Sequence, residues 1–242
     1  MFGTSLSATF NPPAGLPTAK RAGGGVLNGT LPLRWVYPTQ DGSVVVSVLF
    51  GPMGGPFTAR LVEWMHEEGR CRPEIRDLDY IDLMEDLGYT DLWVADSQMI
   101  WSDCYAVMAL AAARTTRLRI GTGVAVAGTR PAAVTATAHA TINRIAPGRV
   151  FCGIGTGNTA MRIMGHKPIP MAEFDDYLGT LRTLMDGGEA EVRWRGHTAP
   201  SRHIMPDAGF VSFAPRMPMY VSAFGPKATA LAAKHGDGLV MS

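Results

Sequence analysis

The sequence predicts an α/β fold made of repeated strand–helix units, because two kinds of segment alternate along the chain after residue 43. Short apolar runs that end at glycine, proline or a polar residue are typical of buried strands. Longer segments with apolar residues three or four positions apart are typical of helices that cover a sheet. Such alternation produces a parallel sheet with right-handed crossovers, so the pattern alone leaves a doubly wound sheet and a barrel open.

The first unit combines a β-branched strand, a long connection and an amphipathic helix. Gly51 and Pro52 end the strand, because proline cannot donate a hydrogen bond to a central ladder. The helix begins with Pro73, a residue that suits the first helical turn. In order, we expect a buried strand at Val44–Phe50, a connection over residues 51–72 with a short helix near Leu61–Glu67, and a helix at Pro73–Leu87 that Gly88 ends.

The later units repeat this pattern more regularly. Residues 189–217 interrupt it and indicate an irregular or hairpin insertion. In the helix that follows the glycine-containing strand, Val134 and Ile145 are among the apolar residues expected to face the core. The expected strands are 91–95, 118–126, 150–154, 219–223 and 239–241, and the expected helices are 105–114, 132–145, 172–185 and 227–235.

The number of units is too small for a complete barrel. We count six strands and five intervening helices, whereas a closed barrel of this type has eight of each. The chain stops after its sixth strand, so we expect an incomplete barrel over residues 41–242 and a chain cut from a longer one. Open parallel edges favour pairing, which suggests a homo-oligomer. Residues 1–40, rich in glycine and proline, are expected to be an irregular extension.

The composition excludes several functional classes. The chain has 242 residues, 46% of them hydrophobic, and a net charge of +1, which favours a folded core over disorder. No basic block points to nucleic acid, and no apolar run is long enough to span a membrane. There is no secretory signal pattern, and Cys71, Cys104 and Cys152 are too few and scattered for a disulfide framework. We therefore expect a cytoplasmic protein that acts on a small molecule.

Two glycine-rich segments stand at strand positions. The turn after the strand at 150–154 resembles a dinucleotide-binding fingerprint, but the third glycine of that pattern would fall on Asn158. A tight turn and contact with a flat ligand both remain open there. Gly121 and Gly123 interrupt another strand, which indicates a bulge or the close approach of a ligand.

Polar groups follow two other strands. The segment from Gly225 to Lys227 begins a helix, where free N–H groups and the helix dipole attract phosphate. Asp96 and Ser97 come directly after a strand, where α/β folds place their chemistry, although Asp96 could equally close a turn or cap a helix. The histidine spacing fits no metal site, and no nucleophile elbow is present. His139, on an apolar helix, is expected to be a satisfied core residue.

Three segments together resemble the luciferase-like flavin-dependent oxidoreductases, which are built on a TIM barrel. Their order and spacing match over residues 44–242, and within the family the sequence is similar to the branch that includes methylenetetrahydromethanopterin reductase and the bacterial monooxygenases like it. One departure is that Arg130 stands where family members often carry histidine. The resemblance implies a TIM-barrel type of α/β fold with about six of its eight units. The segments are residues 88–98, residues 118–157 with their intervening Thr129–Pro131, and residues 218–238.

The resemblance also implies a cofactor site at the carboxyl ends of the strands. The ring of FMN, or of a deazaflavin coenzyme, would lie against a bulge in the third strand, and the phosphate would lie at the last helix start. Met99–Trp101 would give a dry wall. The implied catalytic residue is Asp96. The implied cofactor-binding residues are Ser97, Thr122, Gly123, Val124, Gly155, Thr156, Gly157, Asn158, Gly225, Pro226 and Lys227.

The function first expected from this resemblance is that of a monooxygenase. Reduced FMN, supplied by a partner flavin reductase, would react with oxygen and oxidise a small organic substrate. The first alternative is hydride transfer with the deazaflavin coenzyme F420 and no oxygen. The second alternative is a non-catalytic or truncated subunit.

Overall fold

The computed structural model describes residues 20–22, 25–28, 31–34, 36–38, 43–45, 51–78 and 89–241. The chain divides into two compact units, which are treated separately: residues 1–49 together with Ser242, and residues 50–241. The described cysteines, Cys71, Cys104 and Cys152, are free thiols. No helix in the described ranges combines the length and the apolar character that crossing a bilayer requires.

The first unit contains short antiparallel strands where an irregular extension was expected. Strands β1, β2 and β3 form a three-stranded sheet, and β4 pairs with β5. The strand expected at Val44–Phe50 is therefore a strand over residues 43–45 with an antiparallel partner, and residues 46–50 lie outside the described ranges. The strands are β1 (Lys20–Ala22), β2 (Gly25–Asn28), β3 (Leu31–Arg34), β4 (Val36–Pro38) and β5 (Ser43–Val45).

The second unit begins with a helix that is longer than the short one expected near Leu61–Glu67. Helix α2 (Gly51–Glu67) occupies most of the expected connection, and α3 (Pro73–Arg76) follows it. Three glycines and two prolines in its first half oppose helix formation, so only the second half was expected to be helical. Thr58 and Val62, one turn apart, are buried. Residues 79–88, the rest of the expected second helix, lie outside the described ranges.

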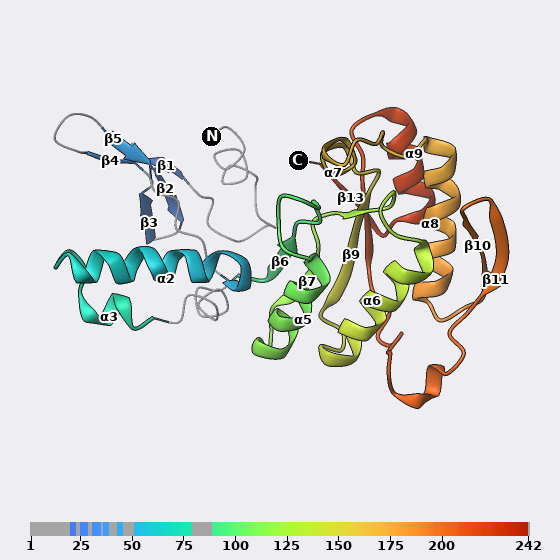
Figure 1. Cartoon of the computed structure of the whole chain (residues 1–242), viewed down its shortest axis with the longest axis horizontal. Coiled ribbons are helices and arrows are strands. Elements are labelled where there is room, and N and C mark those ends of the chain that lie inside the picture. Colours follow the sequence, from blue (N-terminus) through green and yellow to red (C-terminus); the bar gives the residue numbers. More distant parts are fainter. Residues whose placement is uncertain are drawn as a thin grey trace. The chain divides into compact units, whose positions relative to one another are not determined.

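A parallel sheet of six strands forms the centre of this unit (Figure 1). Its order is β13-β12-β9-β7-β6, and the short strand β8 also pairs with β9. In the described part of the chain β6 and β13 are the edges, so the barrel is not closed, as the sequence predicted. The strands are β6 (Asp91–Val94), β7 (Arg119–Thr122), β8 (Ala125–Val126), β9 (Val150–Gly155), β12 (Met219–Ser222) and β13 (Gly238–Val240).

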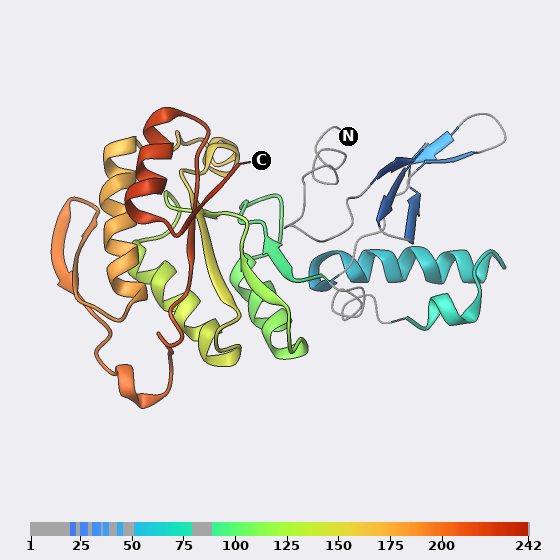
Figure 2. The same ribbon diagram turned by 180° about the vertical axis from the view of Figure 1, so that it is seen from behind.

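Four helices pack side by side in chain order along this sheet (Figures 1 and 2). The expected hairpin insertion is present and pairs β10 with β11 beyond α8. The short α7 and a 3₁₀ turn were not predicted. The packed helices are α5 (Cys104–Arg114), α6 (Ala132–Ile145), α8 (Met171–Met185) and α9 (Pro226–His235); the other elements are α7 (Asn158–Ile163), β10 (Ala190–Trp194), β11 (His197–Ser201) and the turn Pro206–Ala208.

The two faces of the sheet carry different side chains. Ile120, Cys152 and Val221 belong to the core that the helices cover. The alternate residues Trp93 and Phe151 gather on the opposite face, with ring centroids 4.5 Å apart. On that face the Phe151 ring crosses β7 at a glycine, since a Cβ at residue 121 would lie 2.2 Å from it.

The predicted apolar stripe of α6 is wrong at two positions. Val134 is 51% exposed and Ile145 is 47% exposed, whereas small and polar residues of the helix are buried. Because α6 lies closely between α5 and α8, alanines face its neighbours; of the bulky residues in the predicted stripe, Ile142 is buried, whereas Val134 and Ile145 point outward. His139 is fully buried and its Nδ1 lies 2.9 Å from the carbonyl of Thr135, which confirms it as a satisfied core residue.

Candidate functional site

The carboxyl ends of β6, β8, β9 and β12 surround a cavity of about 390 Å³, which we call the strand-end hollow. Ligand sites of parallel α/β folds occur at this edge of the sheet. The starts of α7 and α9 complete its wall. It is lined by Ala95, Asp96, Ser97, Gly123, Val124, Val126, Gly155, Thr156, Gly157, Asn158, Thr159, Ala160, Met171, Ser222, Phe224, Gly225 and Ala228.

The floor of the hollow is a kinked strand. Strand β7 ends at Thr122, β8 begins at Ala125, and both pair with β9. This is the interruption that the sequence predicted. The peptide bond between Gly123 and Val124 is cis, and the N–H of Gly123 donates to the carbonyl of Val94 at 2.7 Å. The kink brings main-chain atoms to the surface of the hollow.

Glycines are required where this segment meets β9 and its following turn. A Cβ at Gly153 would lie 2.2 Å from the Thr122 carbonyl oxygen. At Gly155 it would lie 3.0 Å from Val124 Cγ2, which is tight but short of a collision with backbone. Gly157 has φ +80°, a left-handed conformation that favours glycine. The resulting surface consists of main-chain atoms from which few side chains project, and such a surface can accept a flat group.

Asp96 lines the hollow, but its carboxylate is already engaged. Oδ1 accepts from Nε2 of Gln98 at 2.5 Å. Oδ2 accepts from the N–H of Val126 at 3.0 Å and from Nη1 of Arg130 at 2.7 Å. The side chain is 1% exposed. Sequence analysis expected a polar group beside the reacting atoms; the structure shows a carboxylate that holds protein groups.

Thr122 lies behind the kink and does not line the hollow. It is fully buried, and its Oγ1 donates to the Gly153 carbonyl at 2.6 Å. Nε2 of His139 lies 3.5 Å from the same hydroxyl. Burial lowers the pKa of His139 to about 4, so the ring is neutral at pH 7. Together Thr122 and His139 support the kink from the core side.

The start of α9 provides the other predicted group of residues. Gly225 precedes the helix, lines the hollow and has open space where a Cβ would stand. No side chain caps this helix, and Pro226 occupies its first turn. The next N–H groups and the helix dipole therefore favour an anion here. Pro226 and Lys227 do not line the hollow.

The hollow thus brings together every predicted site residue except Thr122, Pro226 and Lys227. Met99, Ile100 and Trp101, the expected dry wall, are exposed and lie outside its lining. Apolar lining comes instead from residues that sequence reasoning missed. Ser222 and Phe224 had a signal, since they lie within three positions before the predicted Gly225, but Met171 comes from the start of α8 and had none. The missed lining residues are Ala95, Val126, Thr159, Ala160, Met171, Ser222, Phe224 and Ala228.

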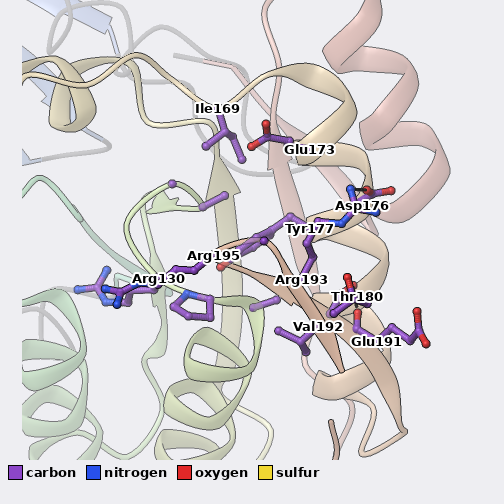
Figure 3. A pocket seen from close by; sticks show the side chains of 16 residues that line it. Arg130, Ile169, Glu173, Asp176, Tyr177, Thr180, Glu191, Val192, Arg193 and Arg195 are labelled. Carbon is purple, nitrogen blue, oxygen red and sulfur yellow. Dashed lines mark hydrogen bonds and ion pairs between the residues drawn. The ribbon is translucent and has the colours of Figure 1, made fainter. Parts of the chain in front are cut away.

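A larger pocket of about 580 Å³ lies between the start of α6, α8 and the hairpin (Figure 3). We call it the hairpin pocket. Figure 3 shows charged side chains of α8 and β10 along it, including the ion pair of Arg193 with Asp176 at 3.4 Å. None of the predicted site residues lines it, although Ala127 and Gly128, which directly follow β8, and Arg130 belong to its lining. Among the described residues, no group of three or more histidines, cysteines or carboxylates is arranged to hold a metal ion.

Comparison with known proteins gives a family match and several curated relatives. The model of the luciferase-like monooxygenase family matches residues 60–242. The 5,10-methylenetetrahydromethanopterin reductase of Methanolobus tindarius is 28% identical over 179 residues, which are 70% of this chain and 51% of the relative. The F420-dependent glucose-6-phosphate dehydrogenase of Beutenbergia cavernae is 32% identical over 178 residues, with shares of 67% and 51%. The chain spans about half the length of these relatives.

Solved structures confirm the fold. The coenzyme F420-dependent tetrahydromethanopterin reductase of Methanopyrus kandleri aligns with a TM-score of 0.58 at 20% identity, over 80% of this chain and 55% of that one. A monooxygenase of Streptomyces bottropensis aligns with a TM-score of 0.56 at 20% identity, over 66% and 50%. At these identities the likeness concerns the TIM-barrel type of architecture.

Proposed function

The chain belongs to the luciferase-like monooxygenase family, and on that premise we propose that it is an oxidoreductase that binds the deazaflavin coenzyme F420 in the strand-end hollow for hydride transfer. The observation that carries the proposal is the kinked, glycine-rich floor at Gly123 and Gly155. It presents backbone to a ligand at the edge of the sheet where α/β folds bind cofactors.

The residues present fit a flat ring. A Cβ at Gly155 would meet Val124 at 3.0 Å and Ser222 at 3.3 Å, so a side chain there would crowd both residues, and glycine leaves main chain as the surface of the floor. The volume of about 390 Å³ is within the range of ligand pockets, roughly 300–1,000 Å³. Val124, Met171 and Phe224 supply apolar contact, and this apolar lining excludes water from part of the ring surface.

Polar groups surround the apolar part. The uncapped start of α9 at Gly225 is suited to the phosphate of the coenzyme side chain, and Lys227 adds a positive charge nearby. Ser97, Asn158 and Ser222 can donate hydrogen bonds to ring or ribityl oxygens. When bound, the deazaflavin supplies the carbon that gives or takes the hydride. The chain binds the ring, orients it and limits the access of water.

Identity favours F420 over FMN, the cofactor first expected from the sequence. The curated relatives at 28% and 32% identity are a methylenetetrahydromethanopterin reductase and an F420-dependent dehydrogenase. The monooxygenase structure is only 20% identical and supports the shared fold alone. We therefore propose the deazaflavin alternative as the function and treat oxygen chemistry as the competing outcome.

Parallel titrations test this proposal. The purified protein is titrated with F420 and with FMN, and the fluorescence of each cofactor is followed. We expect saturable binding of F420 and weaker binding of FMN. Binding of FMN alone would overturn the deazaflavin assignment in favour of oxygen chemistry. Binding of neither by protein with intact circular dichroism would overturn both and support a non-catalytic subunit.

A further inference from the structure

We propose that Arg130 is a positioning residue of the strand-end hollow, because it holds the buried carboxylate that fixes the kinked strand. Its effect on a cofactor rests on the function proposed above, whereas its effect on the strand does not. Arg130 stands on the loop before α6 and does not line the hollow. It therefore acts through Asp96.

The guanidinium of Arg130 is fixed on three sides. Nη1 donates to Oδ2 of Asp96 at 2.7 Å, and Nη2 donates to Oδ2 of Asp103 at 3.1 Å. The group also lies over the ring of Tyr105, 4.8 Å from its centroid. The Arg130 side chain is 18% exposed. This arrangement uses the planar fork of arginine, which a lysine cannot reproduce.

Asp103 fixes the outer end of this link. Its Oδ1 accepts the N–H groups of Tyr105 and Ala106, both at 3.0 Å, and so caps α5. Because Arg130 binds the other oxygen of the same carboxylate, it is anchored to the start of a packed helix. Arg130 thus joins a rigid element to the end of β6.

Asp96 passes this constraint to the kinked strand. The Oδ2 atom that accepts from Arg130 also accepts the N–H of Val126, the last residue of β8. A carboxylate that is 1% exposed requires compensation of its charge, and Arg130 supplies a positive charge. Removing that charge leaves an uncompensated ion beneath the loop, and the bond to Val126 is the first contact affected.

Val126 determines where two walls of the hollow lie. A Cβ at Gly157 would lie 2.2 Å from Val126 Cγ1, so this side chain packs directly on the turn after β9. The next residue, Ala127, donates its N–H to the Gly155 carbonyl at 3.0 Å. Because packed interiors leave little free volume, displacing Val126 displaces the glycine-rich turn too. Arg130 therefore affects the geometry of the proposed ring site through Asp96 and Val126.

Arg182 provides a matched control. It is 13% exposed and also joins two carboxylates: its guanidinium pairs with Asp186, and its Nη1 lies 3.6 Å from Asp237. Nη1 also donates to the carbonyl of Met217 at 3.0 Å. Met217 and Asp237 lie just before β12 and β13, so this network lies at the amino ends of the strands, opposite the hollow. Its loss should lower stability without changing the hollow.

The experiment compares Arg130→Met, Arg130→Lys, Asp96→Asn and Arg182→Met with the unmodified protein. Thermal unfolding, F420 affinity by fluorescence and hydrogen exchange of peptides covering 122–131 and 153–159 are measured for each. We expect Arg130→Met to weaken F420 binding by about tenfold or more and to raise exchange in both peptides. Arg130→Lys should recover part of both effects, since it keeps the charge.

The double variant Asp96→Asn with Arg130→Met should cost less affinity than the sum of the two single changes, because both act through one bond. Arg182→Met should lower the unfolding temperature and leave F420 affinity within about twofold.

Equal affinity losses in Arg130→Met and Arg182→Met would overturn the proposal. If the unmodified protein binds no F420, the proposed function fails, and unchanged exchange in Arg130→Met would then overturn the positioning role itself. If Arg130→Met does not fold, Arg130→Lys and Asp96→Asn are judged by the same criteria.

Discussion

The amino ends and the carboxyl ends of the parallel strands are built in opposite ways. Before the strands, arginine side chains bind main-chain carbonyls: Arg149 donates to the carbonyls of Leu118 and Ala112, both at 2.9 Å, and Arg182 donates to that of Met217. After the strands, glycines leave main chain open to the hollow, and Arg130 does not line it. Long polar side chains close the amino ends of the strands, whereas the carboxyl ends expose backbone.

This difference separates stability from binding within one sheet. Substitutions before the strands should change the free energy of unfolding and leave ligand affinity intact. Substitutions after the strands should change ligand affinity, and the buried ones should change both. This division is the usual one for barrels of this type.

The largest expected effect concerns Gly155. In Gly155→Val the new side chain meets Val124 and Ser222, and it occupies the floor where the ring is proposed to lie. We expect F420 affinity to fall by about a hundredfold or more, which corresponds to roughly 3 kcal/mol. Fluorescence titration measures it. The control is Gly179→Ala on α8, where the added Cβ meets only ordinary contacts and should leave affinity unchanged.

Acid sensitivity at the core side of the hollow gives the second prediction. Burial lowers the pKa of His139 to about 4, below its ordinary value of 6.5, so protonation favours the unfolded chain. The contribution of neutral His139 to the free energy of unfolding is therefore fully present above pH 6.5. It decreases as the pH falls toward 4 and then levels off, with a total loss of about 3 kcal/mol.

Chemical denaturation at several pH values measures this loss. The variant His139→Gln should lack this component over the same interval, so the difference between the two curves isolates it from carboxylates that titrate nearby. Parallel curves for the two proteins would show that His139 does not cause the acid sensitivity.

A smaller effect is expected at Thr122. In Thr122→Val the shape is kept, but the Gly153 carbonyl loses its 2.6 Å donor. We expect a loss of about 1–2 kcal/mol in the free energy of unfolding, as for a buried polar group left without its partner. Urea unfolding checks this value, and a loss much smaller than that would show that the kink does not depend on this bond.

The smallest effect is expected at Lys227, next to the proposed phosphate position. Lys227→Met should weaken F420 binding by about fivefold at low salt, with a smaller difference at high salt. Affinities measured at two ionic strengths test this. A salt-independent loss would argue that Lys227 acts through packing at the start of α9.

The sequence predicted the sheet and its helices well where local signals agreed. In α8, for example, the apolar spacing matched the buried residues, including Phe174, Leu178 and Leu181. It failed where signals conflicted: glycines and prolines concealed the first half of α2, and the stripe chosen for α6 placed Val134 toward the core. Local pattern cannot show how closely two helices approach.

For the candidate site, the sequence predicted where residues lie in the fold better than it predicted what their side chains contact. Asp96 was expected at the carboxyl end of a strand, and it lies there. Its partners Val126 and Arg130, however, follow it by 30 and 34 positions in the chain, so its holding role depends on the tertiary fold. The contribution of Met171 to the hollow is likewise a product of the fold alone.

A crystal structure of the protein with coenzyme F420 bound is the most direct test of the central claim. The account predicts density for the three fused rings against Gly123 and Val124, with the phosphate beside Gly225. Ring density in the larger hairpin pocket, or anywhere away from the kinked strand, would contradict it.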